Sequence, residues 1–155
     1  MSLTQNDVRQ IQLAKAALYA GIKLLMERAG ISVVERIRLA GAFGSHIDPK
    51  YAMVLGLIPD CDLKDVDSAG NAAGTGARIA LLNVAARREI ETVVRKIEKI
   101  ETAVEPGFQD YFVDAMAFPN KKDPFSTLFS VVNKPPQKTV VTERVSRRSG
   151  RRRPV

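Results

Sequence analysis

The residues of this sequence best suited to chemistry by type and spacing form two glycine-rich segments, which suit ligand binding by backbone groups. The first reads Gly-Ala-Phe-Gly-Ser over residues 41–45 and follows the alternating residues 35–40. A glycine turn at the end of a strand lets backbone N–H groups approach a ligand, because no Cβ blocks them. A plain turn between a strand and a helix is the alternative interpretation of this pattern.

The second segment reads Gly-Asn-Ala-Ala-Gly-Thr-Gly-Ala over residues 70–77. It resembles a phosphate cradle at a helix N-terminus, where free N–H groups and the helix dipole favour anions. It does not match the nucleotide-binding pattern G-x-x-x-x-G-K-[ST], because no lysine follows Gly76. Glycine and alanine residues four apart also let a helix lie close to a sheet, and we favour this packing interpretation.

The remaining reactive side chains are weaker candidates. His46 follows the first glycine turn and is placed to hydrogen-bond a ligand, although a lone histidine more often has a structural role or faces solvent. Cys61 lies between two aspartates, whose charges disfavour the thiolate, so we do not expect a nucleophile. The aspartates at positions 60, 62, 65 and 67 lack the glycine and glutamate of a calcium loop, and we interpret them as a solvated acidic loop.

The composition excludes several classes of site. One Cys and one His among 155 residues leave no internal disulfide, no all-cysteine zinc or iron–sulfur site and no H-E-x-x-H motif within this sequence. No stretch approaches the roughly 18 uninterrupted apolar residues of a membrane-spanning helix. The N-terminus has Asp7 before its first arginine, unlike a secretory signal. We therefore expect no metal site and no membrane association, and we expect a cytoplasmic location.

The net charge of +7 belongs to the end of the chain. Residues 134–155 contain eight basic residues and one acidic residue, whereas residues 1–133 contain 16 of each. An arginine-rich tail can bind nucleic acid by releasing counterions. This tail has no aromatic residues to stack on bases, and a solubilising end explains it equally well. We therefore do not expect nucleic acid as a partner.

Hydrophobic periodicity predicts an α/β fold with a small sheet packed by helices. Helices are predicted from a cap at Thr4 to Gly30, from Asp48 to Gly56, over residues 71–95 with a possible break, and from residue 108 to a stop at Pro119. Strands are predicted over residues 35–40 and 63–66, and more weakly over 97–104. We expect a domain over residues 1–119 and a basic, Pro/Arg-rich tail over residues 120–155 that is disordered or only partly docked.

Several segments taken together resemble one family. They are TQNDVRQIQLAKAA at residues 4–17, LAGAFG at 39–44, GLIP at 56–59, GNAAGTGA at 70–77 and FQDYFVDAM at 108–116. In order and spacing they are similar to the C-terminal part of the reductive activators of corrinoid proteins and their ferredoxin-linked relatives. The resemblance implies a ribonuclease-H-like lobe of the actin, Hsp70 and sugar-kinase ATPase superfamily, in which two lobes close on a nucleotide.

This resemblance also implies roles for the two glycine segments. Gly41, Ala42, Phe43, Gly44 and Ser45 look like the nucleotide-binding motif on the adenosine side of the second lobe. Residues 70–77 look like the small-residue helix that packs beside it. Members of the family use ATP to drive electron transfer from an iron–sulfur centre to the cobalt of an inactive corrinoid protein, restoring Co(I). The implied partner is therefore a corrinoid protein.

The sequence departs from the family in two ways. The family's cluster is ligated by several cysteines, commonly in an N-terminal ferredoxin-like domain, and this chain has one Cys. The first lobe would lie before residue 1. We therefore expect a C-terminal fragment with no catalytic residue, which alone binds ATP weakly or not at all, and an iron–sulfur cluster only in the missing N-terminal part. The rival hypothesis is a protein-interaction or dimerisation module that does not bind nucleotide. In that case the chain is expected to bind a partner protein or to form a homodimer.

Overall fold

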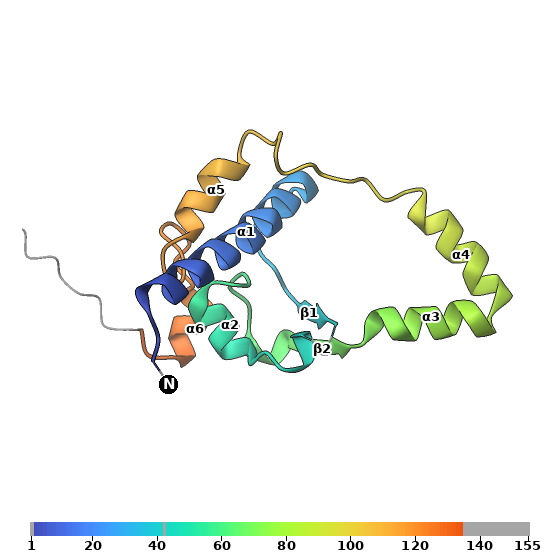
Figure 1. Ribbon diagram of the computed structural model, residues 1–155, viewed down its shortest axis with the longest axis horizontal. Helices are drawn as coiled ribbons and strands as arrows, with labels where there is room; N and C mark the ends of the chain where they lie inside the picture. Colours follow the sequence, from blue (N-terminus) through green and yellow to red (C-terminus); the bar gives the residue numbers. More distant parts are fainter. Residues whose placement is uncertain (1, 42, 135–155) are drawn as a thin grey trace, which may run out of the picture.

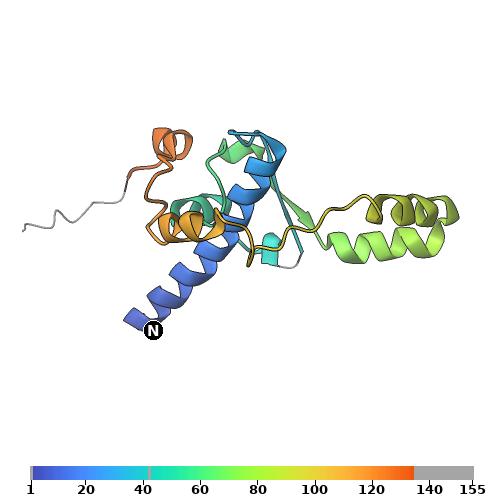
Figure 2. The same ribbon diagram turned by 90° about the horizontal axis from the view of Figure 1, so that it is seen from above.

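A computed structural model describes residues 2–41 and 43–134, with Phe43 described by its backbone only. Helix α1 (Gln5–Ala29) crosses a body that contains a two-stranded sheet and the short helices α2 (Pro49–Leu55), α5 (Phe108–Ala115) and α6 (Ser126–Val131). Helices α3 (Ala72–Leu82) and α4 (Val84–Val94) form a hairpin that extends away from this body (Figures 1 and 2). The α/β class predicted from periodicity is confirmed.

The ends of α1 are set by local side-chain chemistry. The hydroxyl of Thr4 accepts from the N–H of Asp7, and the carboxylate of Asp7 accepts from the N–H of Thr4 at 2.8 Å, which is a capping box. Gly30 takes the left-handed conformation at the other end. Asp48, Pro49 and Gly56 begin and end α2 in the same manner. Both predicted helices are therefore confirmed to within a residue.

The sheet consists of two parallel strands, β1 (Ile37–Ala40) and β2 (Val66–Gly70). Ile37 lies opposite Val66 and Ala40 opposite Gly70, with an irregularity between Leu39 and Ala40. The strand predicted at residues 63–66 begins only at its last residue. Residues Leu63–Asp65 form a 3₁₀ turn, η2, because the carboxylate of Asp62 caps the N–H of Lys64 at 3.2 Å.

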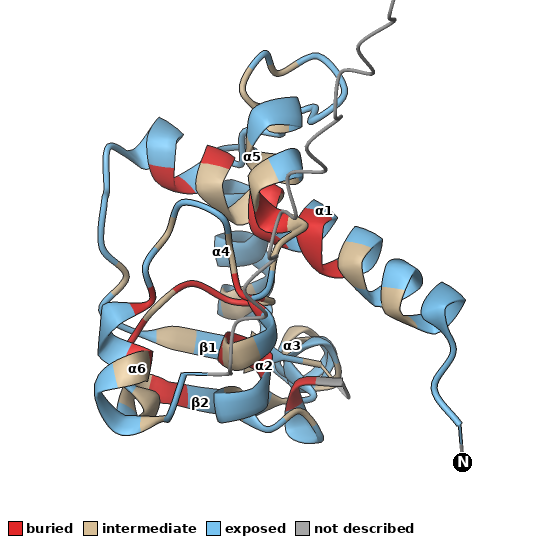
Figure 3. Cartoon of the chain, turned by 90° about the vertical axis from the view of Figure 1, so that its left-hand side faces the viewer, coloured by how far each residue is buried: buried red, intermediate tan, exposed pale blue. Residues whose placement is uncertain are grey.

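The core lies between α1, the sheet and the short helices. Figure 3 shows buried positions on one side of α1 and on the segments that face it. The largest buried apolar side chains of this core come from α1, α2, α6 and the residue before α6: Tyr19, Met53, Phe125 and Leu128. Its burial drives the assembly of elements that are individually short, since an isolated helix of fewer than about 12 residues is marginal in water.

The folded part extends beyond the expected boundary at residue 119. Phe125 and Leu128, which are 1% and 0% exposed, belong to the core. The carboxylate of Asp60 accepts from the N–H groups of Thr127 and Leu128 at 2.8 and 2.9 Å, so a distant residue caps α6. Residues 120–134, assigned to the tail from their composition, therefore pack on the domain. The rest of the predicted tail, residues 135–155, lies outside the described residues.

The helix predicted over residues 71–95 is interrupted at Asn83. Its side chain accepts from the N–H groups of Ala85 and Ala86 at 2.9 and 3.1 Å, which starts α4 in a new direction. The weakly predicted strand over residues 97–104 is wrong, because this segment is a loop with turns. Ile97 and Val104 are 68% and 76% exposed, and no neighbouring strand accepts their hydrogen bonds among the described residues.

Within the described part of the chain, no helix combines the length and the apolar character needed to cross a membrane.

Candidate functional site at the paired strand ends

The two glycine segments meet at the carboxyl edge of the sheet. The N–H of Gly41, just after β1, donates a 2.7 Å hydrogen bond to the carbonyl of Gly70 at the end of β2. Both glycines have positive φ angles, 96° and 59°, and a Cβ at either position would meet no atom within 4 Å. The backbone is therefore open at both turns. Carboxyl ends of parallel strands are where ligands bind in open α/β sheets.

The first turn folds back tightly on its own strand. A Cβ on Gly44 would lie 2.6 Å from the carbonyl oxygen of Leu39, so only glycine fits this buried position. The exposed hydroxyl of Ser45 donates to the carbonyl of Gly41 and accepts from the hydroxyl of Ser68, both at 3.5 Å. These contacts join the turn after β1 to strand β2. Of the predicted site residues, Ala42 lies outside the described residues, and only the backbone of Phe43 is described.

The second segment begins α3 directly beside the first turn. The side chain of Asn71 accepts from the N–H of Gly74 at 2.9 Å, and a Cβ on Gly74 would lie 2.6 Å from that side chain's nitrogen. Because Asn71, the N-cap of α3, directly follows Gly70, the N-terminus of α3 and the first turn occupy the same end of the sheet. A helix N-terminus presents backbone N–H groups and a partial positive charge, which favour anions. The residue pattern alone does not place the two turns together, whereas the family resemblance implies that residues 70–77 lie beside the first turn.

The packing interpretation of the second segment is not supported by the described structure. No residue of α3 is buried, and a Cβ on Gly76 would meet nothing within 4 Å. The glycines of α3 therefore do not bring this helix close to the two-stranded sheet. Instead, Gly70 forms the turn that accepts the hydrogen bond from Gly41, and the side chain of Asn71 caps α3 at the N–H of Gly74.

The other candidate side chains have different surroundings. His46 follows the turn and is exposed. Cys61 is 4% exposed, and its thiol donates to the carbonyl of Glu35 at 3.4 Å. Burial, together with the charge of Asp65, raises the pKa of the Cys61 thiol, which agrees with the expectation that it is no nucleophile.

Three of the four clustered aspartates have structural contacts. Asp60 caps α6, as described above, and Asp62 caps η2 and pairs with Lys64 at 2.8 Å. Asp67 pairs with Arg38 across the two strands at 3.2 Å. These carboxylates serve helix caps and surface ion pairs, which suits the acidic-loop interpretation.

Among the described residues, backbone groups and small side chains dominate the paired strand ends, so the arrangement suits ligand binding. A cavity of about 620 Å³ lies elsewhere among the described residues. It is lined by Leu3, the first part of α1, the end of α2 and the segment from Phe118 to Pro124, together with Phe129 and Lys134. Cavity size therefore does not point to the glycine turns, whereas backbone geometry does.

Comparison with known proteins gives three consistent matches. Residues 1–129 match the family model described as the C-terminal domain of RACo, the ASKHA domain. The chain is 44% identical over 117 residues to the corrinoid activation enzyme RamQ of Eubacterium limosum, covering 74% of this chain. A solved structure, the reductive activator for corrinoid, iron–sulfur protein, matches 76% of this chain with a TM-score of 0.68 and 33% identity.

The chain spans about a fifth of the length of these relatives, 20% of the first and 19% of the second. The matched part contains both glycine turns, since the family match runs from residue 1 to residue 129.

Proposed function

This chain belongs to the family of C-terminal ASKHA domains of RACo, and on that premise we propose that it forms the adenosine-side wall of the nucleotide site in an ATP-dependent reductive activator of a corrinoid protein. The observation that carries the proposal is the hydrogen bond between Gly41 and Gly70, which joins two open glycine turns at one edge of the sheet. The residues assigned to the nucleotide are Gly41, Ala42, Phe43, Gly44 and Ser45.

The described residues of this turn fit a nucleotide. The φ angle of 96° at Gly41 and the empty space at its Cβ position leave room for a planar or sugar group against the backbone. Gly44 keeps the turn in place by packing under Leu39. ATP, when bound, supplies the phosphoryl group whose transfer drives the activator. The residues of this chain bind and orient the nucleotide through backbone contacts.

Catalysis needs groups from outside this chain. Phosphoryl transfer depends on positioning and on charge stabilisation around the transferred group, and the glycine turns bring neither a lysine nor a carboxylate of their own. An iron–sulfur cluster held by several cysteines does not fit a sequence with one buried Cys. We therefore assign nucleotide hydrolysis and electron transfer to regions of the longer relatives that this chain does not match, and expect weak ATP affinity here.

The proposed partner is a corrinoid protein, because the relatives are named as activators of corrinoid proteins. Reduction of cobalt to Co(I) needs a reducing compartment, so we assign the protein to the cytoplasm.

Two alanine substitutions at glycines with positive φ angles test the proposal. Gly41 and Gly30 have φ angles of 96° and 66°, and both have open space at the Cβ position. Alanine at Gly30 costs about 1 kcal/mol of backbone strain, and alanine at Gly41 costs more, because its φ angle lies beyond the left-handed region. We expect Gly41→Ala to lower the affinity for a non-hydrolysable ATP analogue at least about fivefold, and Gly30→Ala to leave it unchanged. Calorimetry on the longest natural polypeptide containing this sequence measures both.

Equal affinities for Gly41→Ala, Gly30→Ala and the parent protein would show that this turn does not contact the nucleotide. Calorimetry of the same protein with a corrinoid protein separates the rival function, a module that docks the partner without nucleotide. Heat with the corrinoid protein and none with the ATP analogue would favour that rival.

A further inference from the structure

Hydrogen bonds close a ring between the two glycine turns. The N–H of Gly41 donates to the carbonyl of Gly70 at 2.7 Å, and the N–H of Gly70 donates to the hydroxyl of Ser68 at 3.2 Å. That hydroxyl donates to the hydroxyl of Ser45, which in turn donates to the carbonyl of Gly41, both at 3.5 Å. The ring therefore includes Ser68, a residue that lies outside both glycine segments of the sequence.

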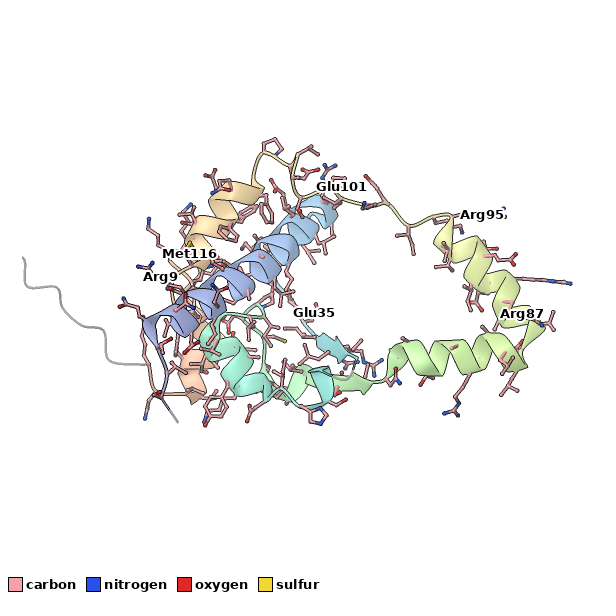
Figure 4. All side chains as sticks on the ribbon, in the orientation of Figure 1. Arg9, Glu35, Arg87, Arg95, Glu101 and Met116 are labelled. Atoms are coloured by element: carbon pink, nitrogen blue, oxygen red, sulfur yellow. The ribbon has the colours of Figure 1, made fainter. Side chains whose placement is uncertain are left out.

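An irregularity in the sheet brings the members of this ring together. Ser68 and Gly70 lie opposite two consecutive residues of β1, so Ala69 between them is an extra residue of β2. Extra residues of this kind bend a strand and redirect its side chains, and they are common beside functional sites. Figure 4 shows both strands running away from Glu35 toward the start of α3. The ring therefore lies at the end of the sheet where open α/β sheets bind ligands.

The ring fixes what its two hydroxyls can still offer to a ligand. A serine hydroxyl has one proton to donate and two lone pairs to accept with. The carbonyl of Gly41 can only accept, so the proton of Ser45 is used there, and the proton of Ser68 is used on Ser45. Within the described part of the chain neither hydroxyl has a further partner, so each keeps one unused lone pair.

A ligand can reach this pair of acceptors. Both Ser45 and Ser68 are exposed. The two bonds made by their protons are long for hydrogen bonds between oxygens, so the hydroxyls can shift toward a ligand at little cost. The turns therefore present two neighbouring acceptors with no proton left to donate.

We propose that Ser68 is a specificity-determining residue of the nucleotide site, which together with Ser45 accepts a hydrogen bond from a donor group of the nucleoside. This inference rests on the nucleotide function proposed above. A phosphate oxygen can only accept, so it finds no partner on a pair of acceptors. The amino group of adenine and the hydroxyls of ribose can donate. A site that binds such a donor discriminates against an analogue that lacks it.

The test measures how Ser68→Ala changes the discrimination between nucleotides. The protein is the longest natural polypeptide that contains this sequence, and the method is calorimetry, with displacement of a fluorescent ATP analogue for weak binding. One probe is a non-hydrolysable ATP analogue. Three others are its inosine form, which lacks the amino group, and its 2′-deoxy and 3′-deoxy forms, which each lack one ribose hydroxyl.

We expect the parent protein to bind one of the three modified probes about fivefold more weakly than the ATP analogue, which corresponds to the loss of one hydrogen bond. Ser68→Ala should bind the ATP analogue about fivefold more weakly than the parent protein does, and it should bind that modified probe with nearly the parent affinity. The modified probe for which the discrimination disappears identifies the donor group as the amino group or as one ribose hydroxyl.

Two control variants separate the hydroxyl of Ser68 from effects on the fold. Ser68→Thr keeps a hydroxyl at an exposed strand position, where a β-branched residue is favourable, and should keep the parent discrimination. Ser130→Ala removes a hydroxyl that donates to the carbonyl of Thr127 at 2.7 Å in α6, and should leave all affinities unchanged. A residue that only supports the turn would weaken the binding of all four probes by the same factor.

The inference is overturned if Ser68→Ala weakens all four probes equally, if it changes no affinity, or if the parent protein binds all four equally. Gly41→Ala separates this failure from a failure of the proposed function. If Gly41→Ala weakens the ATP analogue in any of these cases, the nucleotide site stands and only the role of Ser68 is wrong. If neither variant weakens it, both assignments are wrong.

Discussion

The ammonium group of Lys15 is buried and donates a 2.6 Å hydrogen bond to the carbonyl of Pro119, 104 residues later in the chain. The same group donates to the carbonyl of Ala117 and lies 4.8 Å from the centre of the Phe118 ring. This contact ties the middle of α1 to the segment that follows α5. Burial lowers the pKa of Lys15 from 10.5 to about 8.

The depressed pKa predicts a stability that depends on pH. Between about pH 8 and 10.5 the unfolded chain holds the Lys15 proton more tightly than the folded chain does. As the pH rises through this interval, the folded chain loses the Lys15 proton before the unfolded chain does. We therefore expect the free energy of unfolding of the parent protein to increase relative to that of Lys15→Met. Urea unfolding of both proteins at several pH values measures the difference. It should be constant below this interval, and a constant difference throughout would contradict the assigned burial.

We expect even a small substitution at Gly56 to lower the free energy of unfolding strongly. A Cβ at this position would lie 2.1 Å from the carbonyl oxygen of Pro119, and the φ angle is 73°. Gly56→Ala therefore combines backbone strain with a steric clash, and we expect a loss of about 3 kcal/mol or more. Gly30→Ala, with a similar φ angle and open space, should cost about 1 kcal/mol. Equal losses in thermal or urea unfolding would show that α2 does not contact Pro119.

The burial of Leu128 leads to a prediction about where the folded domain ends. Its side chain is 0% exposed in the core, so Leu128→Ala should cost about 3 kcal/mol. Val131, in the same helix, is 71% exposed, and Val131→Ala should change stability by less than about 0.5 kcal/mol. Urea denaturation distinguishes the two. A small effect of Leu128→Ala would contradict this and would place the end of the folded domain at residue 119.

Substitution of Asp60 measures how much the cap on α6 contributes to the free energy of unfolding. Asp60→Ala removes the acceptor of two N–H groups, those of Thr127 and Leu128, and should cost about 1–2 kcal/mol. Asp67→Ala removes an exposed ion pair with Arg38 and should cost about 0.5 kcal/mol or less. Hydrogen exchange adds a local measurement, because loss of the cap should speed exchange in α6 more than in α1. Uniform changes in exchange would indicate a different role for Asp60.

Local sequence determined the elements whose ends are made by neighbouring residues. Thr4 and Asp7 begin α1, Gly30 ends it, and Asp48 begins α2, because each cap satisfies backbone groups within four residues. The family resemblance over residues 4–119, confirmed by the match over residues 1–129, rested on motifs of the same local kind. The strand predicted over residues 63–66 differs from the structure, because the pattern of apolar residues does not indicate that Asp62 caps a 3₁₀ turn there.

Tertiary structure decided what depended on distant partners. Residues 97–104 have a strand-like composition but no neighbouring strand in the described part of the chain. Helix α6 is short and follows Pro124 closely, yet it is capped by Asp60 and buries Leu128. The candidate site shows the same division. The sequence by itself determined two glycine turns, each able to expose backbone groups. Only the parallel pairing of β1 and β2 placed Gly41 against Gly70, because hydrogen bonds between strands form across a distance that no local pattern encodes.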